Sequence, residues 1–261
     1  MKLSIHGSRG SIATSSRSTQ KYGGYTSCFE VITDNHQIIF DAGSGFKNVK
    51  FSKSRASFLL LSHFHHDHIQ GLPFNPELFD PKNEIIISSD LCDIELVKQN
   101  IRKYFSPPYF PFDIVSSLSN IEFLPFNAVR RKLEKDISLN SMLLKHPGGS
   151  TGYKLIEKNS SFIYLCDNEF EEDQRRSLAN FSENADLLVW DGMFTQKELA
   201  DKKGWGHSSI EQAIEFNKAA NCKKILITHH APNRSDKELD QIAKDLPELF
   251  TLARDGLEIE V

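Results

Sequence analysis

Short apolar runs recur along the chain, separated by polar and turn-forming residues. They lie at Cys28–Thr33, Gln37–Phe40, Phe58–Leu61, Ile85–Ser88, Met142–Lys145, Phe162–Leu165, Leu187–Trp190 and Lys224–Thr228. Their short length and their content of Ile, Leu, Val and Phe predict strands, most of them buried on both faces. The first two flank Asp34-Asn35, a turn signal that predicts a hairpin.

Longer amphipathic stretches predict helices at Asp90–Tyr104, Glu172–Leu178, Ser208–Ala220 and Asp236–Leu246. In the third, Ser208 is followed three residues later by Glu211, which predicts a capping box. Strands dominate the first part of the chain, and helices alternate with strands later. We therefore expect an α/β fold with two sheets sandwiched between helices. No repeat or linker interrupts the pattern, so we expect a single domain spanning residues 1–261.

Charge and composition narrow the choice of partners. The chain has 31 Lys and Arg against 35 Asp and Glu, a net charge of −4 that argues against a broad electrostatic grip on nucleic acid. Its N-terminus begins a strand-like alternation rather than an apolar signal segment, and no apolar run would span a bilayer. The four cysteines form no CxxC pair, which favours reduced thiols. We expect a cytoplasmic protein with neither nucleic acid nor a membrane as its partner.

The strongest chemical signal is His63-Phe64-His65-His66-Asp67-His68, directly after an apolar run. Imidazole and carboxylate groups are usual ligands of zinc and similar ions. In an extended segment His63 and His65 project to the same side, and Asp67 and His68 can then face a second ion. The alternative is a solvated histidine-rich loop that binds no metal.

Four further apolar runs also end in a potential ligand. The residues that follow or end them are His146, Asp167, Asp191 and His229. Sites in α/β sheets form where the carboxyl ends of the strands meet. The recurrence therefore predicts one shared site at the strand ends.

The order HxHxDH, then His, Asp and His, resembles the metallo-β-lactamase superfamily, over nearly the whole chain from Ile5–Ser11 to His229. The resemblance implies the αββα sandwich of that family and two divalent ions, Zn²⁺ first and Mn²⁺ as the alternative. It implies the following roles: His63, His65 and His146 hold one ion, Asp67, His68 and His229 hold the other, Asp167 bridges them, and Asp41 orients ligands.

Gly206-His207-Ser208-Ser209 resembles a motif of ribonuclease Z and its phosphodiesterase relatives. The resemblance implies hydrolysis of a phosphodiester by a hydroxide that bridges the metals, with Asp67 in the catalytic centre. His207 would then be the general acid and Asp191 would orient it. The alternative is that His207 merely precedes a helix cap.

The number of residues between His146 and Asp167 indicates which kind of substrate this chain takes within the group. Many ribonuclease Z enzymes carry a long tRNA-binding arm there, whereas this chain has room only for a turn and a strand. The resemblance thus favours a small cyclic phosphodiester, foremost a 3′,5′-cyclic nucleotide, and a homodimer. The alternatives are a tRNA 3′-end endonuclease, a cyclic ribose phosphate phosphodiesterase, a hydrolase of carbonyl compounds and a metal-stabilised binding protein.

Four residues are candidate substrate contacts. Thr26 and Ser27 lie in a segment that, with Ser8–Ser11, resembles the N-terminal loops of small cyclic phosphodiesterases, although Tyr25 replaces their usual Asn. Phe110 belongs to the aromatic, proline-rich stretch Tyr104–Phe112, for which we predict an ordered loop. Arg234 follows His229 closely. The alternative for Thr26, Ser27 and Phe110 is that they only pack within the structure. The alternative for Arg234 is a surface ion pair.

Overall fold

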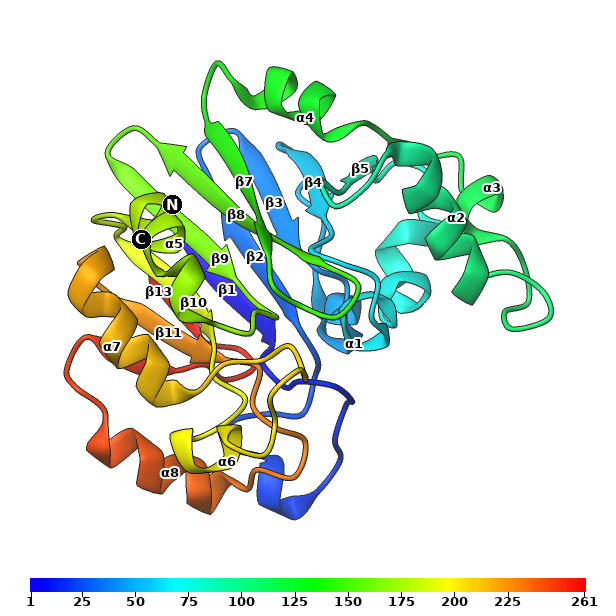
Figure 1. Cartoon of the computed structure of the whole chain (residues 1–261). Helices are drawn as coiled ribbons and strands as arrows, with labels where there is room; N and C mark the ends of the chain where they lie inside the picture. Colours follow the sequence, from blue (N-terminus) through cyan, green and yellow to red (C-terminus); the bar gives the residue numbers. More distant parts are fainter.

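The computed structural model describes all residues from 1 to 261, and its strands form two sheets (Figure 1). The seven-stranded sheet has the order β13-β1-β2-β3-β4-β5-β6, with β1 Lys2–Gly7, β2 Cys28–Ile32, β3 His36–Phe40, β4 Ala56–Leu60, β5 Ile85–Ser88, β6 Ile121–Phe123 and β13 Glu258–Glu260. The six-stranded sheet has the order β12-β11-β10-β9-β8-β7, with β7 Ser138–Leu144, β8 Ser150–Glu157, β9 Ser160–Leu165, β10 Leu187–Asp191, β11 Ile225–Thr228 and β12 Phe250–Leu252. The strands β3 to β6 run parallel to one another, as do β9 to β12, and the other pairs in both sheets are antiparallel.

Helices cover the outer face of each sheet, with one exception. The helices are α1 His66–Ile69, α2 Ile94–Tyr104, α3 Ile114–Ser117, α4 Phe126–Leu133, α5 Arg175–Ser182, α6 Gln196–Leu199, α7 Ile210–Ala220 and α8 Asp236–Asp245. The exception is α4, whose apolar residues Phe126, Val129 and Leu133 pack into the core between the sheets. In Figure 1, α2 and α3 lie beside the first sheet, and α5, α7 and α8 lie beside the second. None of these helices combines the length and apolar character that a membrane crossing needs.

The main core lies between the two sheets. Phe40 on β3 packs against Phe162 and Tyr164 on β9, with ring centroids 5.4 and 5.3 Å apart. Its neighbour Ile39 points the other way, into the cluster under α1 and α2 that includes Val97. Both faces of β3 are thus buried, which explains why its sequence is a continuous apolar run.

The αββα sandwich expected from the sequence is confirmed, and every predicted strand and helix is present. Four strands, β6, β8, β12 and β13, and four helices, α1, α3, α4 and α6, were not predicted from the sequence. The chain between His146 and Asp167 holds two strands, β8 and β9, where one was expected. β8, Ser-Thr-Gly-Tyr-Lys-Leu-Ile-Glu, carries too many polar residues to stand out as an apolar run.

The capping prediction was wrong by one residue. Ser209 caps α7, accepts a hydrogen bond from the backbone N–H of Gln212, and forms the capping box with that residue. The hydroxyl of Ser208 instead donates to the backbone carbonyl of Asn168. Ser208 thereby ties the start of α7 to the loop after β9, where Asp167 lies.

Candidate metal centre

The histidines and aspartates predicted as ligands converge at one end of the two sheets. The loop after β4 and the start of α1 carry His63, His65, Asp67 and His68, while His146, Asp167 and His229 follow β7, β9 and β11. Asp41, Asp167 and His229 have φ angles of 61, 58 and 60°. Non-glycine residues seldom adopt this left-handed conformation, and it is concentrated at functional sites.

One group of donors consists of His63, His65, His146 and Asp167. Asp167 Oδ2 lies 3.6 Å from His63 Nε2 and 3.5 Å from His146 Nε2. The latter nitrogen lies 3.0 Å from His65 Nδ1. These are the spacings of atoms that can surround one small cation.

The second group consists of Asp67, His68, Asp167 and His229. Asp167 Oδ1 lies 3.1 Å from His68 Nε2 and 3.2 Å from His229 Nε2. Asp67 Oδ2 lies 3.1 Å from the same His229 nitrogen. Asp167 therefore offers one carboxylate oxygen to each group, which is the arrangement a bridging ligand needs.

The unpaired nitrogens show that the residues fit a pair of divalent ions. His63 Nε2 and His68 Nε2 are buried and make no hydrogen bond, although each points at the carboxylate oxygens. An unpaired buried polar atom costs roughly 1–3 kcal/mol. A mixed set of imidazole nitrogens and carboxylate oxygens is the donor set that Zn²⁺ accepts. Coordination of a metal ion would satisfy these atoms where hydrogen bonding does not.

Asp41, at the end of β3, holds the loop of ligands in place. Its carboxylate accepts hydrogen bonds from the backbone N–H of Ser62 at 2.7 Å and from the Tyr164 hydroxyl at 2.8 Å. It also lies 2.8 Å from His68 Nδ1. Asp41 thus fixes the His68 ring so that Nε2 faces the centre, the role expected of it from the sequence.

Glu169 supports His146 in a way that the sequence did not reveal. Its two carboxylate oxygens accept hydrogen bonds from the backbone N–H groups of Gly204 and Gly206, at 2.7 and 2.8 Å. The carbonyl of Gly206 in turn lies 2.7 Å from His146 Nδ1. Gly206 has a φ of 85°, and a Cβ atom there would lie 2.2 Å from that nitrogen. Only glycine fits at this position.

The electrostatics of the cluster suit a bound cation. Burial lowers the pKa of His63 well below its ordinary value, so it presents the neutral imidazole that a metal binds. Burial also disfavours a charge on His68, but the carboxylates of Asp167, Asp67 and Asp41 outweigh it and raise its pKa well above the ordinary value. The negative charge that acts on His68 is the charge that a divalent ion would neutralise.

His207 and Asp191 form a pair beside the ligands. His207 Nδ1 lies 2.8 Å from Asp191 Oδ2, and the His207 ring stacks on that of His229 with centroids 4.8 Å apart. Burial opposes protonation of His207, but the carboxylates of Asp191, Asp167 and Asp67 together outweigh it and raise the pKa to about 9. His207 therefore carries a proton at neutral pH, despite its place before the positive end of α7.

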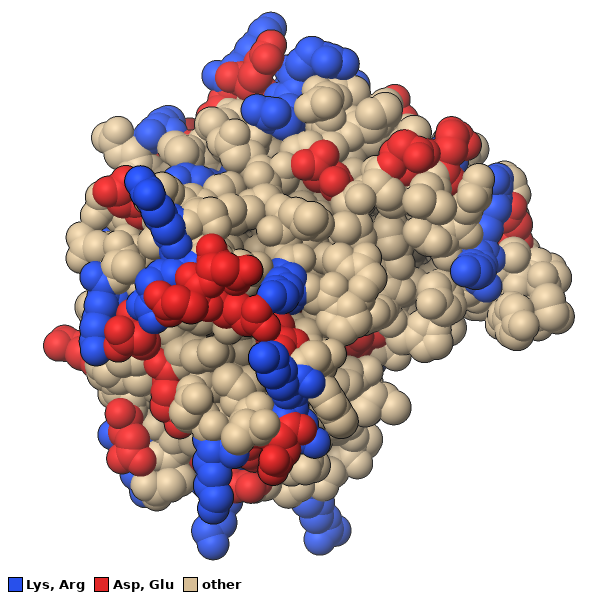
Figure 2. All heavy atoms as spheres, in the orientation of Figure 1, with Lys and Arg blue, Asp and Glu red and all other residues tan.

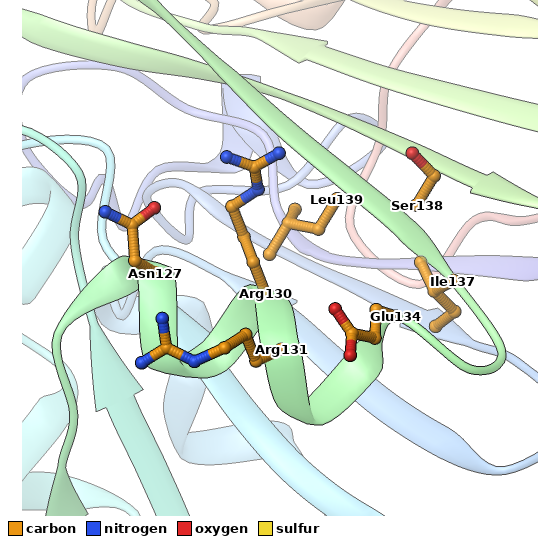
Figure 3. A pocket seen from close by; sticks show the side chains of 7 residues that line it. All are labelled: Asn127, Arg130, Arg131, Glu134, Ile137, Ser138 and Leu139. Carbon is orange, nitrogen blue, oxygen red and sulfur yellow. The ribbon is translucent and has the colours of Figure 1, made fainter.

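A pocket of about 340 Å³ opens onto the cluster, lined by Ser11, His65, His66, Asp67, Tyr104, Asp167 and His207. The backbone N–H of Ser11 donates to Asp67 Oδ2 at 2.7 Å. A second hollow of about 350 Å³ lies between α4 and β7, at the other end of β7 from His146 (Figure 3). Arg130, Arg131 and Glu134 line it, with no histidine or cysteine, so it lacks the donors of the first pocket.

The four predicted substrate contacts do not line the pocket that opens onto the cluster of histidines and aspartates. Thr26 and Ser27 are fully buried, and Thr26 Oγ1 accepts from the backbone N–H of Ser44 at 2.8 Å. Phe110 packs edge-on against Phe112, with centroids 5.2 Å apart. The Arg234 guanidinium pairs with Glu198 and also donates to the carbonyl of Met193. The positions of Thr26, Ser27 and Phe110 match the packing alternative, whereas Arg234 is buried and its ion pair with Glu198 is not the surface pair that was the alternative.

Comparisons with known proteins agree with this geometry. The model of a family described as a β-lactamase superfamily domain matches residues 36–230. The ribonuclease Z of Azobacteroides pseudotrichonymphae genomovar. CFP2 is 25% identical over 266 residues, which cover 85% of this chain and 86% of that protein. The ribonuclease Z of Haloarcula marismortui is 22% identical and covers the whole chain and 97% of its own length.

Among solved structures, the metallo-β-lactamase fold protein YhfI from Bacillus subtilis superimposes with a TM-score of 0.73 at 19% identity. The alignment covers 100% of this chain and 98% of YhfI. At these identities the likeness supports the fold alone.

Proposed function

Because the chain belongs to the β-lactamase superfamily, in its ribonuclease Z-like branch, we propose a specific reaction for this metal-dependent hydrolase. The proposed reaction is hydrolysis of a small cyclic phosphodiester, foremost a 3′,5′-cyclic nucleotide. The pairing of His207 with Asp191 beside the two groups of metal donors carries this proposal.

The pair matches what a phosphodiester leaving group needs. When a P–O bond breaks, the departing alkoxide must gain a proton, and a positioned acid accelerates this step. His207 holds its proton at neutral pH, because its pKa is about 9. Asp191 engages Nδ1 and leaves Nε2 as the nitrogen that donates to the leaving oxygen.

Two divalent ions, when bound, supply an activated water and neutralise charge on the phosphate. Hydrogen bonds within the chain hold Asp67 and Asp191 in position. Asp67 is fixed by the Ser11 backbone N–H on one side and faces His229 on the other. Asp191 also accepts from the backbone N–H of Met193 at 3.1 Å, so the acid and the ligands share one rigid frame.

The dimensions of the molecule favour a small substrate. Between His146 and Asp167 the chain forms only the β8–β9 hairpin, both strands of which pair within the sheet, so no arm extends there. The pocket of about 340 Å³ is at the lower end of the range for small-molecule sites. On the face shown in Figure 2, acidic and basic side chains are interspersed rather than gathered into one basic surface.

The relatives support a second candidate, cleavage of precursor tRNA at its 3′ end. Two ribonuclease Z enzymes match this chain over 85% and 100% of its length. A nucleic-acid substrate would then be gripped by a surface other than an arm between β7 and β9. A cyclic ribose phosphate is a third candidate with the same chemistry.

We propose Zn²⁺ as the resident ion, with Mn²⁺ as the alternative, and a cytoplasmic homodimer as the working form. Three imidazoles and one carboxylate in the first donor group suit Zn²⁺. Elemental analysis of the purified protein tests the metal, and light scattering coupled to size-exclusion chromatography tests the dimer.

The deciding experiment is a substrate panel with the protein loaded separately with Zn²⁺ and Mn²⁺. The panel contains the four common 3′,5′-cyclic nucleotides, a cyclic ribose phosphate and a precursor tRNA. Turnover of a cyclic nucleotide that His207→Asn abolishes supports the proposal. Catalytic cleavage of the tRNA without turnover of any cyclic phosphate replaces it with the second candidate. No turnover of any phosphodiester by the metal-loaded protein overturns the reaction class.

A further inference from the structure

We propose that Tyr104 is the specificity-determining wall of the pocket and stacks on the aromatic base of a nucleotide substrate. This inference rests on the proposed phosphodiesterase function and deepens it. The Tyr104 ring would favour substrates that carry a base over sugar phosphates that lack one.

Tyr104 is the one aromatic carbocycle that lines the pocket, and its six companions there are histidines, aspartates and a serine. Its ring meets the exposed ring of His66 edge-on, with centroids 4.5 Å apart. Tyr104 is half-buried, and its hydroxyl makes no hydrogen bond within the chain. The ring thus offers an apolar surface at the mouth of an otherwise polar site.

The backbone that carries Tyr104 is fixed by the helix that ends there. Tyr104 is the last residue of α2, and the next backbone N–H, that of Phe105, still donates to Ile101 in the helix at 3.0 Å. The ring of Phe105 packs 6.3 Å from that of Tyr104. An ion pair between Arg102 and Asp113, 2.9 Å long, closes the base of the loop that follows. Such anchoring places the ring before a ligand arrives, which lowers the entropic cost of binding.

The pocket lining therefore offers two kinds of surface. Asp67, Asp167 and His207 are the groups that would meet the phosphate, and Tyr104, in contact with His66, is the aromatic one. Every nucleobase has a flat π-face, so stacking on one aromatic ring holds a base without reading its sequence. A bare sugar phosphate has nothing to place against this ring.

The loop beyond Tyr104 supplies a matched control. Tyr109 belongs to the same aromatic stretch but is 81% exposed and does not line the pocket. In Figure 2 the tip of the projection that carries α2 and α3 is mostly uncharged. Replacing Tyr109 therefore removes an aromatic ring from the same loop without touching the proposed wall.

The test compares Tyr104→Leu, Tyr104→Phe and Tyr109→Leu as metal-loaded full-length proteins. Two substrates are used: 3′,5′-cyclic AMP, and the 3,5-cyclic phosphate of 1-deoxyribose, which is the same ring system without a base. We expect Tyr104→Leu to lower kcat/KM for cyclic AMP about tenfold or more, mainly through KM, and to change the abasic substrate less than about twofold. Tyr104→Phe keeps the ring and should stay within about twofold of wild type on both substrates, as should Tyr109→Leu.

Thermal melting checks that each variant is folded, and Tyr104→Gln, which also removes the ring, replaces Tyr104→Leu if that variant melts early. An equal loss on both substrates, or no loss on either, overturns the role of Tyr104 while leaving the phosphodiesterase proposal intact. If wild type turns over neither substrate, the proposed function fails first, and with it the basis of this inference.

Discussion

The two sheets contribute to the candidate metal centre in different ways. The first sheet supplies His63, His65, Asp67 and His68 from one loop after β4. The second supplies its ligands singly, since His146, Asp167 and His229 each follow a different strand. These neighbours in sequence are positioned by α1 and by the hydrogen bonds of Asp41, which follows the adjacent strand β3. Scattered ligands are positioned only when the second sheet has formed.

The comparison shows where the centre is most vulnerable. Asp167 and His229 both adopt left-handed backbone conformations, which the folded sheet must impose. Asp167 also belongs to both of the donor groups described above, whereas each of their histidines belongs to one of the two. Substituting a histidine of the loop set (His63, His65, Asp67 and His68) should therefore release one ion, whereas substituting Asp167 in the scattered set (His146, Asp167 and His229) should release both.

The largest effect is expected from Asp167→Asn. Removing the shared carboxylate charge should lower occupancy of both ions and reduce kcat by about 1,000-fold or more, because metal assistance contributes several kcal/mol to such reactions. His63→Gln, from the loop set, should empty one position and leave the other loaded. Elemental analysis after dialysis, together with kcat at saturating metal, measures both. Loss of equal amounts of metal from the two variants would show that Asp167 is not shared by the two donor groups.

His207→Asn comes next and separates proton donation from metal binding. The substitution should lower kcat by about 100- to 10,000-fold for an alkoxide leaving group, with metal content unchanged. A p-nitrophenyl phosphodiester releases p-nitrophenolate, which leaves without needing a proton. Its hydrolysis should therefore fall much less. Equal losses with both leaving groups would assign His207 to the metal frame rather than to the acid step.

The same comparison explains what the sequence can predict. The loop set is visible because four ligands stand within six positions after an apolar run. The scattered set is visible only because each ligand ends such a run, and the family resemblance groups them. The apolar runs also predict the strands of the sandwich, since buried parallel strands are apolar on both faces.

Three residues near the site, Ser11, Glu169 and Tyr104, could not be assigned a role from the sequence. Ser11 contributes its N–H to Asp67, a role that no side-chain pattern reveals. Glu169 reaches His146 only through Gly206, whose sequence neighbours give no sign of the contact. Tyr104 was seen as part of an aromatic stretch, but only the end of α2 turns it toward the pocket. These positions depend on where separate loops meet in the folded chain.

Glu169→Ala tests the support given to a scattered ligand, with an effect smaller than that of a ligand itself. Without the carboxylate, the Gly204–Gly206 loop loses two hydrogen bonds and His146 loses its fixed partner. Metal affinity should fall about 10- to 100-fold, as is typical of groups that orient ligands. Titration against a competing chelator measures the change. Glu172→Gln, an exposed acid paired with Arg175, is the control and should bind metal as wild type does.

The smallest predicted effect concerns His36, a buried histidine at the far end of β3 from Asp41, outside both ligand groups. Burial lowers its pKa, a shift that the nearby Asp136 only partly opposes, and its Nδ1 has no hydrogen-bond partner. The unfolded chain takes up a proton near pH 6.5, but the folded chain does so only at lower pH. Stability is therefore lost as pH falls through 6.5 toward the folded pKa. Urea unfolding at pH 8.0 and 5.5 should show a smaller acid-induced loss for His36→Gln than for wild type, and a larger one for Asp136→Asn. Identical losses in all three proteins would mean that acid sensitivity arises at the clustered histidines alone.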